Sequence, residues 1–122
     1  MEKQYNLLIV DDEVVTLKLT KQGLERLGYN VAIFSRPEES LEYFKNNKDS
    51  VHLIISDKSM PRMRGIELLK EIRKIDKEIP FFILTGYTTT EDDEVLLKEG
   101  VTKILMKPLS LKELVAEIKT AL

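Results

Sequence analysis

The sequence predicts a parallel α/β domain made of five successive strand–helix units, a (βα)5 pattern. Three observations predict this fold class. Short apolar runs alternate along the chain with segments whose apolar residues have helical spacing. The runs are almost continuously apolar, which is typical of strands covered on both faces in a parallel sheet. Right-handed crossovers between such strands place helices on both faces of the sheet.

Five apolar runs are expected to be strands. They lie at residues 7–10, 31–34, 51–55, 81–84 and 103–106. All are too short for independent helices and are rich in β-branched or aromatic residues, a composition that favours strands. Each run is followed by one of the segments with helical character, which gives the five strand–helix units.

The intervening segments carry helix signals in chain order. Apolar stripes occur at Val14, Leu17, Leu24 and Leu27, at Ile66, Leu69 and Ile72, and at Leu111, Leu114, Val115 and Ile118. Ser35–Glu38 and Ser110–Glu113 fit the capping box, a hydroxyl residue followed three positions later by Glu. Gly28 is expected to end the first helix. The short, highly charged segment from Glu91 to Glu99 is interpreted as a helix ended by Gly100.

Composition restricts the class of protein. The chain has 122 residues without a Pro/Gly/Ser-rich linker or an internal repeat, so we expect one domain over residues 1–122. A net charge of −2 argues against nucleic acid binding, which usually needs a basic surface. With no Cys and one His, disulfides, thiolate metal sites and multi-histidine metal sites are excluded. No apolar stretch is long enough to span a membrane, and no signal peptide is expected.

Polar residues with chemical capability follow four of the five expected strands. Asp11, Asp12 and Glu13 follow the first, Asp57 follows the third, Thr85 and Gly86 follow the fourth, and Lys107-Pro108 follows the fifth. Ligands of open parallel sheets bind outside the carboxyl ends of the strands. Three carboxylates, a hydroxyl and an amine are therefore expected to converge at that edge.

This set of groups suits phosphoryl transfer. Two carboxylates 4 Å apart repel by about 4 kcal/mol at an effective dielectric constant of 20, and a divalent cation relieves that repulsion. Hard oxygen ligands favour Mg²⁺, while Lys107 and Thr85 can contact an anionic oxygen. Asp57, in the middle strand position, is the expected nucleophile. Taken singly, each residue also fits an ordinary loop or helix start, and only their convergence favours a site.

The residues just described match a known family. The acidic pair Asp11-Asp12, the stretch Asp57–Gly65 (D-x-x-M-P-x-M-x-G), Thr85-Gly86 and Lys107-Pro108 occur in the expected order. Over its whole length the chain resembles the receiver domains of two-component response regulators, including the chemotaxis regulators. The resemblance implies a flavodoxin-like doubly wound fold with the sheet order 2-1-3-4-5.

The resemblance also implies roles for single residues. Asp57 would accept a phosphoryl group from a histidine kinase or phosphotransfer protein. Mg²⁺ would be bound by Asp12, Asp57 and the backbone carbonyl of Ser59, with Asp11 acting through water. Thr85 and Lys107 would contact the acyl phosphate, and the Lys107-Pro108 bond would be cis.

Phosphorylation would then change the domain's surface and its contacts. Thr85 would move inward and repack the face made by the fourth helix, fifth strand and fifth helix, to control an effector protein or domain. The domain would catalyse only its own phosphoryl uptake and loss, in the cytoplasm. Direct nucleic acid or membrane binding is not expected, whereas a homodimer is compatible with the sequence.

Some positions depart from the family pattern. Ile104 stands where the family usually has Tyr or Phe, whose ring takes part in switching, and we interpret it as a strand residue that fills space. Arg64 stands where Asp or Asn is common and, with Lys58 and Arg62, adds a basic rim to an acidic pocket. Ser59 and Tyr87 occupy positions that, in the family, set how long the acyl phosphate survives.

Other function classes remain open. The chain is also similar to receivers of hybrid sensor kinases, in the Gly86-Tyr87 loop and the run 104–108. A Mg²⁺-dependent phosphatase would carry a second Asp two residues after Asp57, where this chain has Ser59. A flavin-binding domain would have a Gly/Ser/Thr-rich loop after the first strand, where this chain has acids. A non-switching docking domain is favoured only by Ile104.

Overall fold

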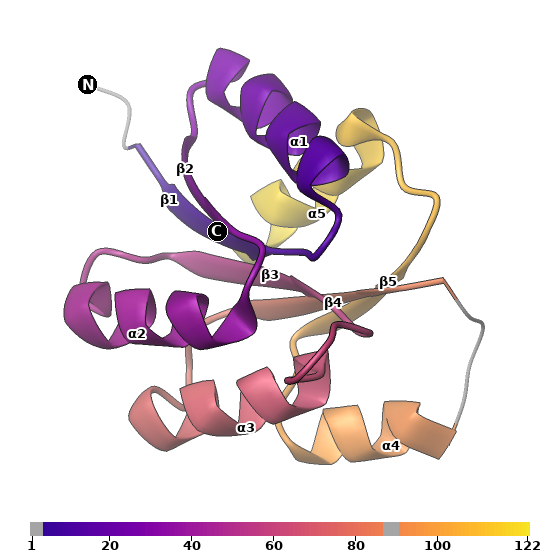
Figure 1. Ribbon diagram of the computed structural model, residues 1–122. Coiled ribbons are helices and arrows are strands. Elements are labelled where there is room, and N and C mark those ends of the chain that lie inside the picture. The colour runs from indigo at the N-terminus through magenta and orange to yellow at the C-terminus, as the bar shows by residue number, and fades with distance from the viewer. Residues whose placement is uncertain (1–3, 87–90) are drawn as a thin grey trace.

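A computed structural model of the chain describes residues 4–86 and 91–122. Strands and helices alternate along the chain (Figure 1). The elements are β1 (Asn6–Val10), α1 (Val14–Arg26), β2 (Asn30–Phe34), α2 (Pro37–Asn47), β3 (Leu53–Asp57), α3 (Gly65–Ile75), β4 (Phe81–Thr85), α4 (Glu91–Lys98), β5 (Lys103–Met106) and α5 (Leu111–Ala121). The predicted (βα)5 succession is confirmed.

The five strands form one parallel sheet in the order β2-β1-β3-β4-β5. Leu7 of β1 lies opposite Val31 of β2 on one side and Leu53 of β3 on the other. Strand β2 is therefore added on one side of β1, and β3, β4 and β5 follow on the other side. The direction in which strands are added reverses between β1 and β3. This is the doubly wound order that the family resemblance implied, and it puts a ligand crevice at the carboxyl ends of these two strands.

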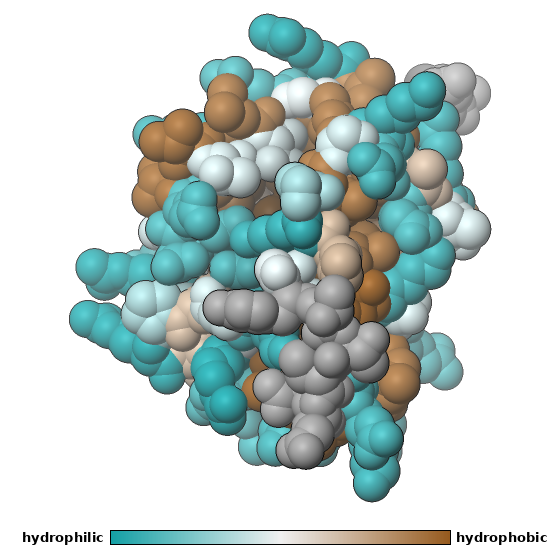
Figure 2. Space-filling model, turned by 90° about the vertical axis from the view of Figure 1, so that its right-hand side faces the viewer, coloured by the Kyte–Doolittle hydropathy of each residue, from teal (hydrophilic) through white to brown (hydrophobic). Residues whose placement is uncertain are grey.

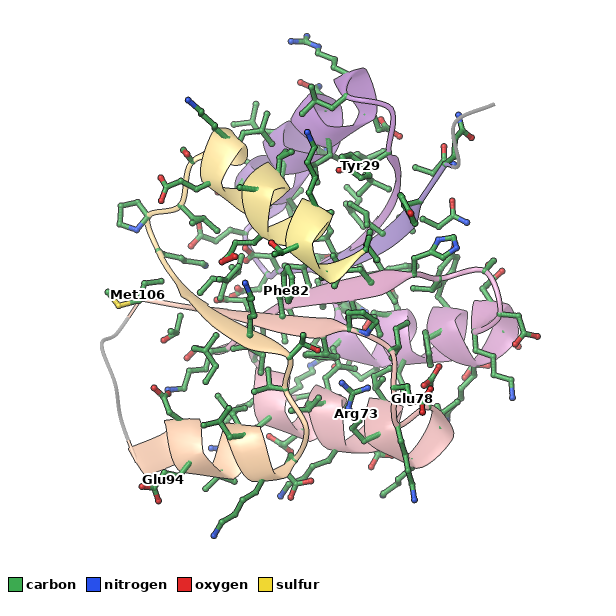
Figure 3. The ribbon with its side chains drawn as sticks, turned by 180° about the vertical axis from the view of Figure 1, so that it is seen from behind. Tyr29, Arg73, Glu78, Phe82, Glu94 and Met106 are labelled. Atoms are coloured by element: carbon green, nitrogen blue, oxygen red, sulfur yellow. The ribbon has the colours of Figure 1, made fainter. Side chains whose placement is uncertain are left out.

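Helices cover both faces of the sheet, with α1 and α5 on one face and α2, α3 and α4 on the other (Figure 1). Successive strand residues point to opposite faces, so Leu7 packs towards α1 and α5 while Leu8 packs towards α2 and α3. Phe82 lies between β4 and α5 (Figure 3), and its neighbour Phe81 is fully buried on the opposite face. Burial on both faces explains the continuous apolar runs.

The third strand lies two residues further along than predicted. It was expected at 51–55 but is observed at Leu53–Asp57. Val51 belongs to the preceding turn, where its amide donates to the Asn47 carbonyl, and the ladder continues until Asp57 pairs with Leu84 of β4. Asp57 is therefore the last residue of a strand, held by backbone pairing, and does not lie in the following loop.

One of the two predicted capping boxes is present. At the start of α5, the Glu113 amide donates to Ser110 Oγ at 3.1 Å and the Ser110 amide donates to Glu113 Oε1 at 3.4 Å. The Ser35–Glu38 box was wrong, because α2 begins at Pro37 and its N-cap is Arg36, without a side-chain cap. Proline is well suited to the first helical position, and it leaves Ser35 one residue too early to cap the helix.

Two helices end just before glycines, as predicted. Gly28 and Gly100 have positive φ values of 98° and 91° and follow the ends of α1 and α4. The apolar stripe of α1 is buried only at its two central leucines, whereas Val14 and Leu27, at the helix ends, are exposed.

Across the described ranges, no helix is long and apolar enough to cross a membrane.

Candidate functional site

The polar residues expected to converge do lie at one edge of the sheet. Asp11 directly follows β1, Asp57 ends β3, Thr85 ends β4 and Lys107 directly follows β5. These four strands are neighbours in that order. Because parallel strands place their carboxyl ends at the same edge, the four residues lie close together there. Three of these four residues carry a charge, and Thr85 contributes the hydroxyl.

Lys107 connects two of the carboxylates. Its Nζ lies 3.0 Å from Asp57 Oδ1 and 3.7 Å from Asp11 Oδ2. The two carboxylate side chains are only 12% and 8% exposed, whereas the lysine side chain is 31% exposed. Restricted access of water makes these ion pairs stronger than pairs on an open surface. The lysine is therefore held over the acidic pair from its solvent side.

Backbone amides fix the orientation of the two carboxylates. The Lys58 amide donates to Asp57 Oδ1 at 3.0 Å and to the Leu84 carbonyl at 2.8 Å, so it joins the site to the sheet. The Glu13 amide donates to Asp11 Oδ1 at 3.0 Å. Hydrogen bonds from the main chain to a carboxylate are charge-assisted and directional. The rotamers of both aspartates are consequently set by rigid elements.

Gly65 is needed for the close approach of α3 to the site. Its amide donates to the Lys58 carbonyl at 2.9 Å. A Cβ atom at this position would lie 2.5 Å from the Asp57 carbonyl oxygen and 3.1 Å from Lys58 Cα. Both neighbours are main-chain atoms and cannot turn aside. The final glycine of the Asp57–Gly65 motif therefore has a steric function that the sequence did not reveal.

Two groups in the site have a raised pKa, one through burial and the other through neighbouring charges. Burial raises the pKa of the Asp11 carboxyl, although the Glu13 amide and Lys107 partly oppose it, and the charges of Asp57 and Asp12 raise the pKa further. For Lys107, burial alone would lower the pKa, but the hydrogen bond to Asp57 and the charges of Asp11 and Asp57 outweigh it and raise the pKa. The lysine therefore stays positively charged over the physiological range.

The acidic residues can hold a divalent metal ion. Oxygen atoms of Asp11, Asp12 and Asp57 lie within 4.8 Å of one another. Asp11 is buried and Asp12 is exposed, so the cluster is open on one side to solvent. Carboxylate oxygens with open positions for water or phosphate suit Mg²⁺. The donor set fits the ion that the sequence predicted, with Asp12 as the accessible ligand.

Addition of Mg²⁺ is expected to stabilise the protein against unfolding. An ion that binds only the folded state at ten times its dissociation constant adds about 1.4 kcal/mol. Thermal unfolding with MgCl₂ and with NaCl at equal ionic strength measures this effect. Asp12→Ala should lose the Mg²⁺ increment, whereas Asp49→Ala, another exposed aspartate in the loop between α2 and β3, should keep it. An increment that survives in Asp12→Ala would contradict the assignment of Asp12.

The basic rim predicted from Lys58, Arg62 and Arg64 is divided in the structure. Arg64 is compensated by Glu67, whose Oε1 lies 3.1 Å from the arginine Nε. Lys58 lines a hollow between the start of α3 and α4. Arg62 lies on the other side of the loop, in a hollow that it shares with Arg36. Sequence reasoning missed Arg36, because it comes from the loop after β2, where no site residue was expected.

Of the remaining predicted positions, three lie in the part of the chain that the structure describes. Ile104 is half-buried on β5 and packs against the core cluster that includes Leu96 of α4, as expected of a residue that fills space. Ser59 is exposed on the loop after β3, and the metal contact of its carbonyl stays a prediction. The Lys107-Pro108 peptide bond is cis, as the resemblance implied. Tyr87 lies outside the described residues.

Comparison with known proteins gives a consistent result. A family model for the response regulator receiver domain matches residues 7–119. The probable transcriptional regulator ycf27 of Cyanidium caldarium is 37% identical over 121 residues, which are 99% of this chain and 47% of that protein. The chain thus spans about half the length of this curated relative.

Solved structures agree in fold. A response regulator receiver domain protein from Clostridium thermocellum is 33% identical with a TM-score of 0.90, covering 96% of this chain and 93% of that one. The chemotaxis protein CheY4 of Vibrio cholerae is 28% identical with a TM-score of 0.91, covering 98% of this chain and 100% of that one. The similarity therefore extends over the whole sheet and its helices.

Proposed function

The chain belongs to the response regulator receiver domain family, and from that premise we propose that Asp57 accepts a phosphoryl group. The donor is the phosphohistidine of a partner kinase or phosphotransfer protein. One observation carries the choice of atom. Lys107 and the Lys58 amide both contact Asp57 Oδ1, and within the described part of the chain no hydrogen bond is made to Oδ2. Oδ2 is therefore the oxygen available for attack on phosphorus.

The proposed reaction forms one bond and breaks one. An electron pair of Asp57 Oδ2 forms the new oxygen–phosphorus bond, and the bond between phosphorus and the donor's imidazole nitrogen breaks, leaving its electrons on that nitrogen. Lys107 neutralises negative charge on the transferred group. Mg²⁺, when bound at Asp11, Asp12 and Asp57, would supply further charge neutralisation. The product is an acyl phosphate on Asp57.

The acyl phosphate would act as a switch through Thr85. This residue is 3% exposed at the end of β4, and its carbonyl accepts from the Lys107 amide at 2.8 Å. A hydroxyl that donates to the new phosphoryl oxygens would draw the end of β4 inward. The neighbouring β5 and α4 carry exposed apolar residues, among them Met106 (Figure 3) and Leu97. We place the effector contact on this α4-β5-α5 face.

The partner that donates the phosphoryl group would dock on α1. Apolar side chains gather over this helix at the upper left of Figure 2, and Val14, Val15 and Leu19 are 46%, 73% and 63% exposed. Beside them a groove of about 440 Å³ runs between α1 and the loop before α5, and its lining includes Asp11 and Lys107. A contiguous exposed apolar patch next to a reactive group is typical of a protein interface.

The chain would act as a signalling domain with no external substrate to turn over. A phosphatase that uses an Asp nucleophile is disfavoured because Ser59 stands where its acid would be. The domain would act in the cytoplasm, where a kinase with ATP can supply the phosphoryl group. The relative from Cyanidium caldarium is named a probable transcriptional regulator, and the part matched here is 47% of its length.

Phosphoryl uptake from a small donor tests the proposal. With Mg²⁺ and acetyl phosphate, we expect the intact mass to rise by one phosphoryl group, and no rise after removal of Mg²⁺ with a chelator. Hydroxylamine should release the group, because it cleaves acyl phosphates and leaves phosphoserine intact. A folded protein that shows no mass increase with fresh donor would contradict the proposed function.

A further inference from the structure

Two arginines line one hollow beside Asp12. Arg36 comes from the loop after β2, and Arg62 comes from the loop after β3. The hollow measures about 250 Å³, and its lining also includes Asp12 and Glu38. Both arginines are exposed, and within the described ranges neither guanidinium forms an ion pair. Two cations from separate loops thus lie at the mouth of the acidic site.

Arg62 adopts a backbone conformation that residues other than glycine rarely take. Its φ is 71°, and the Met63 amide donates to the Pro61 carbonyl across it at 2.8 Å. Glycine would occupy this left-handed position most readily. Backbone strain of this kind is concentrated at functional sites. The chain nevertheless has a long, positively charged side chain at a position whose left-handed backbone conformation favours glycine.

The net negative charge of the acidic site gives a physical reason for an arginine at position 62. The carboxylates of Asp11, Asp12, Glu13 and Asp57 outweigh Lys107 and a divalent ion by one negative charge. A phosphoryl donor is itself a monoanion or dianion near neutral pH. Without further cations, the donor would meet a repulsive field at the entrance. Arg36 and Arg62 outnumber the single carboxylate of Glu38 there once a metal ion has taken the charge of Asp12.

We propose that Arg36 and Arg62 form an entry site for the anionic phosphoryl group of the incoming donor. The two guanidinium groups attract the phosphoryl oxygens. They lie beside Asp12, so they bring phosphorus close to the carboxylate cluster that contains Asp57. This inference rests on the proposed function of Asp57. Fixed charges at the entrance of a site raise the rate of association with ligands of the opposite sign. The two arginines would therefore make donors with more negative charge react faster than donors with less.

The rate of phosphoryl uptake at low ionic strength tests this entry site. Arg36→Gln and Arg62→Gln are each expected to lower the second-order rate constant for acetyl phosphate about fivefold, from the loss of one charge roughly 8 Å from a dianion in water. The maximal rate at saturating donor should stay unchanged. At 1 M salt the difference should disappear, because charges are then screened beyond about 3 Å. Arg26→Gln, an exposed arginine at the far end of α1, is the control and should react as the wild type does.

A glycine variant and a second donor separate charge recognition from misfolding and from donor chemistry. Arg62→Gly relieves the positive φ and should be at least as stable as the wild type, so slower uptake by this variant cannot come from misfolding. Phosphoramidate carries the phosphoryl group on nitrogen, as phosphohistidine does, and is a net monoanion near neutral pH, so it should be slowed about twofold. Slowing with acetyl phosphate alone would overturn recognition of the phosphoryl group.

The outcomes separate this inference from the proposed function. An Arg36→Gln/Arg62→Gln double variant that reacts at the wild-type rate at low ionic strength overturns the entry site and leaves phosphorylation of Asp57 intact. Wild-type protein that takes up no phosphoryl group overturns both. A slowed double variant with normal uptake at high donor concentration and at high salt supports the entry site.

Discussion

Replacing Asp57 by alanine is expected to abolish phosphoryl uptake completely. Of the three clustered carboxylates, only Asp57 combines restricted exposure, an ion pair with Lys107 at 3.0 Å and an oxygen that no described residue engages through a hydrogen bond. Asp11 cannot replace it, because its two oxygens face the Glu13 amide and Lys107. Incubation with Mg²⁺ and acetyl phosphate, followed by intact mass measurement, should show no gain at any donor concentration.

The comparison with Asp12 separates the nucleophile from a metal ligand. Asp12→Ala should weaken Mg²⁺ binding, so its uptake should recover, at least in part, as Mg²⁺ is raised. Asp57→Ala should not recover at any Mg²⁺ concentration, because the oxygen that attacks phosphorus is missing. Circular dichroism confirms that both variants are folded. Uptake by folded Asp57→Ala would reassign the phosphorylated residue.

The parts of the fold that depend on local pattern could be predicted from the sequence. Apolar runs followed by a polar residue marked the strand ends, and parallel topology then required Asp11, Asp57 and Lys107 to meet. The start of α2 was wrong, because Pro37 at the first helical position decides where the helix begins. The third strand was displaced because pairing with β4 continues through Asp57, which apolarity alone did not show.

The parts of the site that depend on loop packing could not be predicted. Arg36 and Arg62 are separated along the chain and lie in the loops after β2 and β3, two strands that are not neighbours in the sheet. Their common hollow depends on how two loops pass the start of α1, and no residue pattern encodes that. The same holds for Gly65, whose conflict with the Asp57 carbonyl arises from the close approach of α3 to β3.

Replacing Gly65 by alanine is expected to destabilise the protein and to impair the site together. The new Cβ atom would lie 2.5 Å from the Asp57 carbonyl oxygen, so the end of β3 or the start of α3 has to move. Overpacking against rigid neighbours costs about 1–3 kcal/mol, more than the helix propensity of alanine returns. Denaturant unfolding measures the loss, and the Mg²⁺ increment should shrink with it because Asp57 is displaced.

Gly23→Ala is the matched control for this steric argument. A Cβ atom at Gly23 would also meet a neighbour closely, at 2.7 Å, but that atom is Cδ2 of Leu111, the end of a flexible and partly exposed side chain. Leu111 can rotate away, and alanine inside α1 is favoured over glycine by about 1 kcal/mol. We therefore expect Gly23→Ala to be neutral or stabilising. Equal destabilisation of the two variants would show that the nearest-atom distance alone, and not the rigidity of the backbone behind Asp57, determines the cost.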